Sequence, residues 1–170
     1  GSITSVGHGL GATPHMMIFK NRDLNNHWTV YHRSFTNQAR NYLKLETTDA
    51  VFTRAADLWG TINSTVFNVD QGFLANANER LIAYCFAPVV GYSSFGSYTG
   101  NGSADGPFVF CNFRPRWILI KNASDSASNW HLVDAARNSF NKSDAILYPN
   151  TSGAEFIDTT FGFADILSNG

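Results

Sequence analysis

The sequence contains few charged residues, and neither sign of charge dominates. Charged residues occupy 15% of the 170 positions, and 12 basic against 13 acidic side chains leave a formal net charge of −1. Nucleic acids and anionic membranes bind proteins through clustered lysine and arginine, and the sequence has no such cluster. It also has no apolar run of the roughly 20 residues that a membrane-spanning helix needs. We therefore expect neither a nucleic-acid partner nor a membrane partner.

Cysteine is scarce, and the common catalytic motifs are missing. Cys85 and Cys111 both lie in apolar, strand-like runs without the C-x-x-C spacing of a zinc site. We interpret both as buried thiols, although their even number also permits a disulfide. Glu46, Glu79 and Glu155 are the only glutamates, whereas a glycoside hydrolase needs two carboxylates facing one cleft. With no G-x-S-x-G motif either, we predict no catalytic residue, no cofactor and no metal site.

Aromatic and neutral polar residues are abundant, and they follow strand-like patterns. The aromatic fraction is 14%. The apolar runs "MMIFKN" (16–21) and "WILIKN" (117–122) are each followed by a polar turn, and "HWTVYH" (27–32) and "NWHLVD" (129–134) predict the returning strands of two hairpins. We expect further strands at 64–69, 81–87, 94–100 and 107–113, and single helical turns within 48–59 and 130–140.

An internal repeat organises these strands. Three successive blocks align in the same order: Pro14 with Pro115, Met17–Asn21 and Trp28 with Ile118–Asn122 and Trp130, and Tyr42–Phe52 with Ile146–Phe156. The separation grows from about 101 to about 104 residues, as small loop insertions require. Agreement over three blocks predicts a duplicated β module.

The repeat predicts a mainly β fold, an antiparallel, jelly-roll-like β-sandwich built from two pseudo-repeats. We place the first repeat at residues 1–90 and the second at residues 91–170, together forming one compact domain that is incomplete at both ends. The second copy has no counterpart of "LIAYCFA" (81–87). We expect the chain to be a piece of a longer protein, with a sheet edge left open.

Four of the five histidines lie between His8 and His32, which raises the question of a metal or catalytic site. His27 and His32 are five residues apart and would lie on opposite faces of a strand, and no H-E-x-x-H motif occurs. In the second copy other polar residues align with them: Arg116 with His15, Asn129 with His27, and Asp134 with His32. We interpret these histidines as replaceable surface or turn residues.

Exposed aromatic residues near hydrogen-bonding side chains are the best candidates for ligand contact, because aromatic faces stack on sugar rings. The loop "SYTGNGSADGPF" (97–108) combines both residue types and has no counterpart in the first copy. A turn built from glycine and asparagine explains the same loop without a ligand. The candidate ligand-binding residues are Trp59, Tyr92, Tyr98, Asn101, Asp105 and Trp117.

Two blocks, "IAYCFAPVVGYSSFGSYTGNGSADGPFVFCNFRPRWILIKN" and "NWHLVDAARN", resemble an uncharacterised repeat module of virion proteins from tailed bacteriophages, especially marine phages. Such modules often lie beside laminin-G or concanavalin-like jelly-roll domains in tail or fibre polypeptides. The most specific features are "SYTGNG", the P-x-x-I-x-I-K-N strand and the following tryptophan. The resemblance covers most of the chain and implies a structural or adhesive role.

The leading functional expectation is a non-enzymatic virion module of a tail, fibre or appendage that contacts host-surface glycan. Its implied partners are other virion proteins or further copies of itself, and its location is the virion, assembled in the host cytoplasm. The alternative is a carbohydrate-binding module of a polysaccharide-degrading enzyme. A glycan hydrolase is the third hypothesis.

Overall fold

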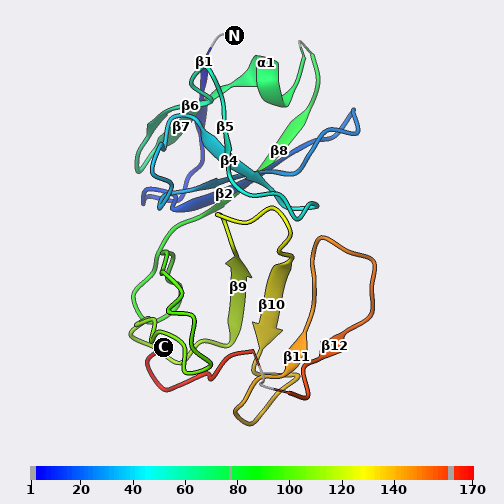
Figure 1. The fold of residues 1–170 in the computed structure, drawn as a ribbon. Helices are drawn as coiled ribbons and strands as arrows, with labels where there is room; N and C mark the ends of the chain where they lie inside the picture. The colour runs from blue at the N-terminus through cyan, green and yellow to red at the C-terminus, as the bar shows by residue number, and fades with distance from the viewer. Residues whose placement is uncertain (1–2, 77, 161–162) are drawn as a thin grey trace.

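A computed structural model describes residues 3–76, 78–160 and 163–170, and it is mainly β, with 33% strand and 2% helix. The predicted antiparallel β fold is therefore confirmed (Figure 1). The elements are β1 (Ile3–Gly7), β2 (Met16–Asn21), β3 (Thr29–His32), β4 (Asn41–Lys44), β5 (Phe52–Thr53), β6 (Trp59–Ile62), β7 (Val66–Asp70), α1 (Gln71–Leu74), β8 (Leu81–Phe86), β9 (Trp117–Lys121), β10 (Trp130–Asp134), β11 (Ala145–Ile146) and β12 (Phe156–Ile157).

A five-stranded antiparallel sheet, in the order β5-β4-β3-β2-β8, forms the centre of residues 3–86. In β2 the side chains alternate between two faces, with Met17 and Phe19 buried and Met16 and Ile18 half-buried on the other face. The turn after β2 is closed by Asn21, whose Oδ1 accepts the N–H groups of Asp23 and Leu24 at 2.9 and 3.0 Å. This Asx turn explains why the apolar run ends there.

A second, three-stranded sheet in the order β1-β7-β6 covers one face of the first. Phe19 lies between the layers, with its ring centroid 5.3 Å from those of both Trp59 and Phe67. The buried cluster between the sheets comprises Met17, Phe19, Tyr31, Tyr42, Leu58, Trp59, Phe67, Val69 and Leu74. Residues 3–86, termed here the first region, thus form a sandwich of two packed sheets.

No helix lies within 48–59 or 130–140, two fully described segments that contain β5, the start of β6, and β10. Of the two expected helical turns, only the second has a helix-like bond, from the Asn138 N–H to the carbonyl of Asp134 at 3.4 Å. The backbone N–H groups of Leu58 and Trp59 instead donate to the carbonyl of Ala39, which brings this segment back over the first sheet. The described helix, α1, follows β7, and Asp70 caps it by accepting a hydrogen bond from the Gly72 N–H at 3.1 Å.

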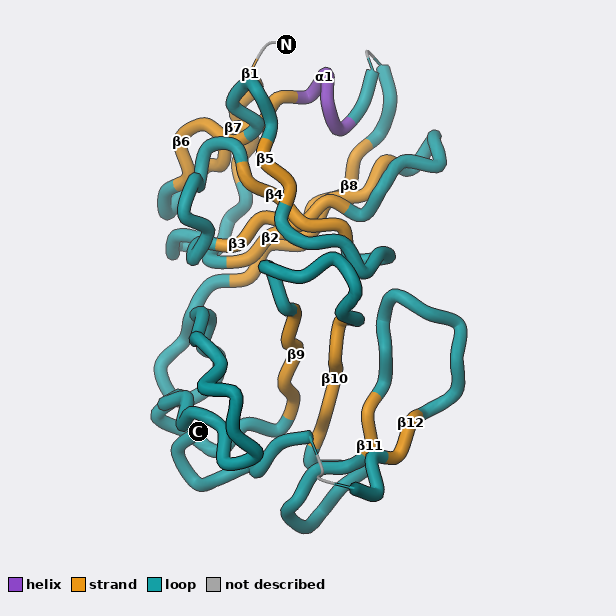
Figure 2. The backbone as a smooth tube through the Cα atoms, in the orientation of Figure 1, coloured by secondary structure: helices purple, strands orange, loops and turns teal. Residues whose placement is uncertain are grey.

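Residues 117–157, termed the second region, contain two separate two-stranded sheets, β10-β9 and β11-β12 (Figure 2). The predicted hairpin of 117–134 is present, and its register pairs Trp117 with Asp134 and Lys121 with Trp130. The strands expected at 94–100 and 107–113 are absent, although both segments are described. Apolar alternation alone does not make a strand when no neighbouring edge is available to pair with it.

The two regions meet where residues 44–51 contact the β9–β10 hairpin, a contact termed the junction (Figure 1). The Trp130 indole N–H donates to the carbonyl of Lys44 at 3.0 Å, and the Val51 N–H donates to the carbonyl of Ala123 at 2.9 Å. Trp130 is 4% exposed and packs with Val30 and Leu43 on the outer face of the five-stranded sheet. The second hairpin therefore covers the face that the three-stranded sheet leaves open.

Candidate functional site

Exposed aromatic side chains gather in residues 89–117, termed the aromatic segment. Tyr92, Tyr98 and Trp117 are 79%, 50% and 56% exposed, and Phe108 and Phe110 are more than half exposed as well. Soluble proteins seldom expose so many large aromatic side chains in one short stretch, and such surfaces usually bind a partner or a ligand. Three of the sequence-predicted ligand residues therefore have accessible rings.

The loop at 101–105 is shaped by its own polar groups. The Asn101 Nδ2 donates to the carbonyl of Asp105 at 2.9 Å, and the Asn101 Oδ1 accepts the Ser103 N–H at 3.0 Å. The structure thus brings the two predicted residues Asn101 and Asp105 together, but Asn101 is engaged in bracing the turn. Both Asn101 and Asp105 are exposed residues.

Trp59 cannot act as a stacking platform, which corrects its inclusion among the ligand candidates. It is 1% exposed, and its indole N–H donates to the carbonyl of Asn41 at 2.8 Å. Its ring centroid lies 5.3 Å from those of both Phe19 and Tyr31. Both faces of the ring are covered by the core, so Trp59 stabilises the sandwich instead of contacting a ligand.

A groove of about 880 Å³ opens between the edges of the two sheets of the first region. Phe19, Phe67 and Val69 line it, and small residues such as Ala75 and Ala83 also border it. Polar residues, including His8, Gln71 and Glu79, also line it, so the groove is more polar than most ligand sites. No residue predicted to bind a ligand borders this groove.

The polar groups bordering the groove are held in place by structural hydrogen bonds. Glu79 accepts hydrogen bonds from the side chain and backbone N–H of Asn76 and from Asn21, and these bonds hold the pKa of the Glu79 carboxyl below its ordinary value. The His8 Nε2 contacts the carbonyl of Asn63 at 3.0 Å while its Nδ1 accepts the Leu10 N–H at 3.2 Å. Glu79 is therefore ionised at neutral pH, which does not suit a general acid.

Sequence reasoning missed the groove because its walls come from both sheets. His8 and Glu79 border the same space although 71 positions separate them in the chain. Small residues such as Gly7, Gly72 and Ala83 border the groove, and small side chains leave space between layers.

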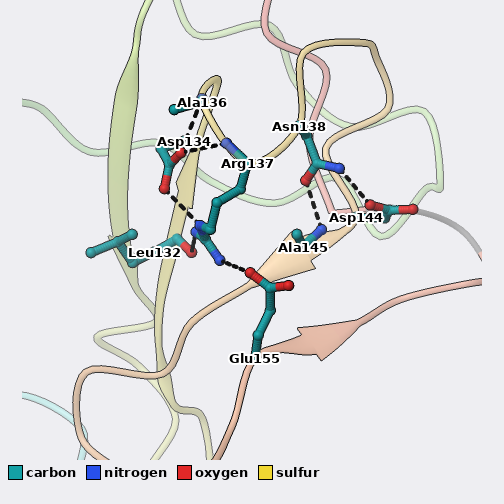
Figure 3. Close-up of polar contacts among 8 residues, drawn as sticks. All are labelled: Leu132, Asp134, Ala136, Arg137, Asn138, Asp144, Ala145 and Glu155. Carbon is teal, nitrogen blue, oxygen red and sulfur yellow. Dashed lines mark hydrogen bonds and ion pairs between the residues drawn. The ribbon is translucent and has the colours of Figure 1, made fainter.

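A polar cluster at the end of β10 contains an ion pair between Asp134 and Arg137 (Figure 3). The Arg137 Nε donates to Asp134 at 2.7 Å, its Nη1 donates to Glu155 at 2.8 Å, and its Nη2 donates to the carbonyl of Leu132 at 3.2 Å. Hydrogen bonds from Arg137 hold the pKa of Asp134 below its ordinary value. Two carboxylates fixed on one guanidinium provide no proton donor, so the cluster braces the loop between β10 and β11.

The third glutamate, Glu46, is also engaged, since it contacts the His27 ring and accepts the Trp28 N–H at 3.0 Å. Among the residues that the structure describes, no three His, Cys, Asp or Glu side chains form a group that could hold a metal ion. Cys85 and Cys111 are free thiols, and burial raises the pKa of both. No described helix is long and apolar enough to cross a membrane.

Comparison with known families gives one match. The family model described as a domain of unknown function (DUF7483) matches residues 1–170. The chain belongs to this family. No curated protein matches the chain, and no solved structure matches it.

In this DUF7483 chain, hydrogen bonds recur at the positions that the sequence aligns. The Arg33 N–H donates to the carbonyl of His15 at 2.7 Å. The aligned Ala135 N–H donates to the carbonyl of Arg116 at 3.0 Å. Three further pairs of hydrogen bonds match in the same way. The side chains of Asn21 and Asn122 accept the N–H groups of Asp23 and Ser124, and those of Glu46 and Asn150 accept the N–H groups of Trp28 and Trp130. The carbonyls of Arg40 and Asp144 accept the N–H groups of Arg54 and Asp158.

The same matches explain how the histidines of this DUF7483 chain can be replaced. The His32 Nδ1 accepts the Ser34 N–H at 3.1 Å, and the aligned Asp134 accepts the Ala136 N–H at 3.0 Å. His27 contacts Glu46, as the aligned Asn129 contacts Asn150. The positions require a hydrogen-bonding group of suitable length, which several polar residues supply.

Proposed function

We propose that this DUF7483 chain is a non-enzymatic structural and adhesive module of a tailed-bacteriophage appendage, and that it contacts host-surface glycan through the aromatic segment. The observation that carries the proposal is the exposure of Tyr92, Tyr98 and Trp117, at 79%, 50% and 56%. Aromatic faces of this kind stack on the apolar faces of sugar rings, and the Asp105 carboxylate of the same segment can accept hydrogen bonds from sugar hydroxyls.

The surroundings of the acidic residues support a role without catalysis. Glu46, Glu79 and Glu155 each have structural hydrogen-bond or ion-pair partners. A glycoside hydrolase instead needs one carboxyl group that keeps a proton near neutral pH and a second that is ionised. Hydrogen bonds lower the pKa of Glu79 and Asp134, which opposes that arrangement.

The test is a glycan array probed with the whole chain and with a triple variant carrying Tyr92→Ala, Tyr98→Ala and Trp117→Ala. We expect the chain to bind a restricted set of host-surface glycans and the triple variant to lose at least about tenfold in affinity, since each stacked ring contributes about 1 kcal/mol. Phe140→Ala is the matched control, because Phe140 is an aromatic residue that is 84% exposed and lies outside the aromatic segment. Binding that survives the triple variant contradicts the proposed surface, and an array without hits contradicts the adhesive role.

The alternative, a carbohydrate-binding module of a polysaccharide-degrading enzyme, uses the same exposed aromatic residues and differs in its genetic context. An open reading frame that joins this chain to a catalytic domain favours that alternative. Neighbouring genes for portal or tail proteins, with no catalytic domain in the same frame, favour the virion module.

A further inference from the structure

The hairpins of the two regions are built in the same register. Met16 pairs with His32 in the first hairpin, and the aligned residues Trp117 and Asp134 pair in the second. The hydrogen bonds that close the two hairpins also match, as described above for Arg33 and Ala135. β9 is therefore the positional equivalent of β2.

The outer edges of these equivalent strands differ. β8 pairs with the outer edge of β2 along its full length, from Met16–Phe86 to Asn21–Leu81. Within residues 3–76, 78–160 and 163–170, no strand pairs with the outer edge of β9, which belongs to a two-stranded sheet. Open edges of this kind bind further strands.

The backbone of β9 presents hydrogen-bonding groups at that edge. Residues of an antiparallel strand direct their N–H and C=O groups alternately to either side. Because the Ala135 N–H donates to the carbonyl of Arg116, the groups of Arg116, Ile118 and Ile120 face β10. The N–H of Leu119 therefore faces the unpaired edge.

The side chains of β9 are also incompletely covered. Met17 and Phe19 of β2 are 0% and 2% exposed, whereas the aligned Ile118 and Ile120 are only partly buried. Leu81 and Cys85 of β8 pack against the core that buries Met17 and Phe19. A strand beside β9 would supply the equivalent cover.

We propose that the free edge of β9 binds an antiparallel strand of the β8 type, contributed by a second DUF7483 module that assembles with this chain. The strand is an extended segment of about six residues with apolar side chains on both faces, as β8 has in "LIAYCF". The relation of β8 to β2 identifies this occupant, because the register and closing hydrogen bonds of the two hairpins are the same. This proposal does not depend on glycan binding.

The test uses the full chain and a synthetic peptide with the sequence of Glu79–Ala87, carrying serine in place of Cys85. Amide hydrogen exchange is followed residue by residue by NMR. We expect the peptide to slow exchange at Leu119 by at least about tenfold, because a hydrogen-bonded amide exchanges only when its pairing opens.

Two N-methylated peptides provide matched controls. The Arg22 N–H donates to the carbonyl of Arg80, so the alternation along β8 directs the N–H groups of Ile82 and Tyr84 towards the paired strand. A peptide methylated at these two nitrogens should leave Leu119 unprotected, whereas one methylated at the nitrogens of Ala83 and of the serine should protect it.

Three results would overturn the proposal. One is unchanged exchange at Leu119 at saturating peptide, and another is equal behaviour of the two methylated peptides. The third is protection of Leu119 that increases with protein concentration without peptide and persists when β8 of the added chain carries the two N-methyl groups that block pairing, since contact between copies would then protect the edge without a β8-type strand.

Discussion

The first and second regions contain equivalent hairpins in very different surroundings. In the first region, β2 and β3 lie inside a five-stranded sheet that a second sheet covers, and Met17, Phe19 and Tyr31 are at most 2% exposed. In the second region, β9 and β10 form a two-stranded sheet, and the residues of β9 are half-buried or exposed. Local sequence thus determines the hairpin and its register, whereas neighbouring strands determine its burial.

The largest difference between the regions should appear on truncating tryptophans. Trp59→Ala removes a ring that is 1% exposed, and it should lower the free energy of unfolding by about 3–5 kcal/mol. Trp117→Ala removes a ring that is 56% exposed and should change it by less than about 0.5 kcal/mol. Urea denaturation followed by circular dichroism measures both. Similar losses in the two variants would contradict the assignment of Trp59 to the core.

A smaller difference is expected for the aligned lysines. The Lys121 Nζ donates to three carbonyls, those of Thr48 at 3.0 Å, Asn122 at 2.8 Å and Ser128 at 3.0 Å. Lys20 donates to the carbonyl of Asn26, which aligns with Ser128. Lys121→Met should lower the free energy of unfolding by about 1.5–3 kcal/mol. The matched Lys20→Met should lower it by less, because fewer hydrogen bonds to a charged group are lost. Thermal unfolding of the two variants tests this order, and a larger loss for Lys20→Met would reverse it.

The aligned tryptophans Trp28 and Trp130 test the junction. Trp130→Phe removes the indole hydrogen bond to Lys44, whereas Trp28 stacks on Tyr84 with 6.4 Å between ring centroids. Trp28→Phe removes the same atoms as Trp130→Phe. The Trp130→Phe variant should nevertheless lose about 1 kcal/mol more free energy of unfolding, which is the net value of one hydrogen bond. Chemical denaturation of the two variants measures the difference. Equal costs would show that the indole bond does not stabilise the junction.

The smallest expected effect concerns pH and His131 in the second region. Its ring stacks on Phe163 at 4.7 Å between centroids, and burial lowers its pKa. The unfolded chain therefore binds the proton more readily, so this residue's contribution to stability is complete above pH of about 6.5 and is lost as pH falls. The chain should become less stable relative to His131→Phe as pH decreases from 7 to 5, as measured by unfolding at several pH values. A constant difference would contradict this.

The sequence was sufficient to predict the parts of the fold that depend on neighbouring residues. The hairpins at 16–32 and 117–134 follow from apolar runs and an Asx turn, whose hydrogen bonds span only two or three residues. The burial of Trp59 was not predicted, because the carbonyl that its indole contacts belongs to Asn41, 18 positions away. The groove was missed for the same reason, since its walls come from both sheets.

The segment 107–113 shows the opposite limit. Its apolar residues predicted a strand, but the N–H groups of Cys111 and Asn112 donate to the carbonyl of Asn169 outside any ladder. Phe108 and Phe110 remain exposed as a result. A strand pattern is realised only where a partner edge is available, and sequence alone does not locate that edge.

The separation of the strands between the regions has a consequence for the continuity of the chain. No strand of β1–β8 pairs with a strand of β9–β12 in the residues described, and the connecting loop around Gly102 is exposed with a φ of +71°. A chain divided at this loop keeps every strand pair within one fragment. The two fragments would meet only through the junction, where Lys44, Thr48 and Val51 contact the β9–β10 hairpin, so their association when mixed would measure how strongly the junction alone holds the regions together.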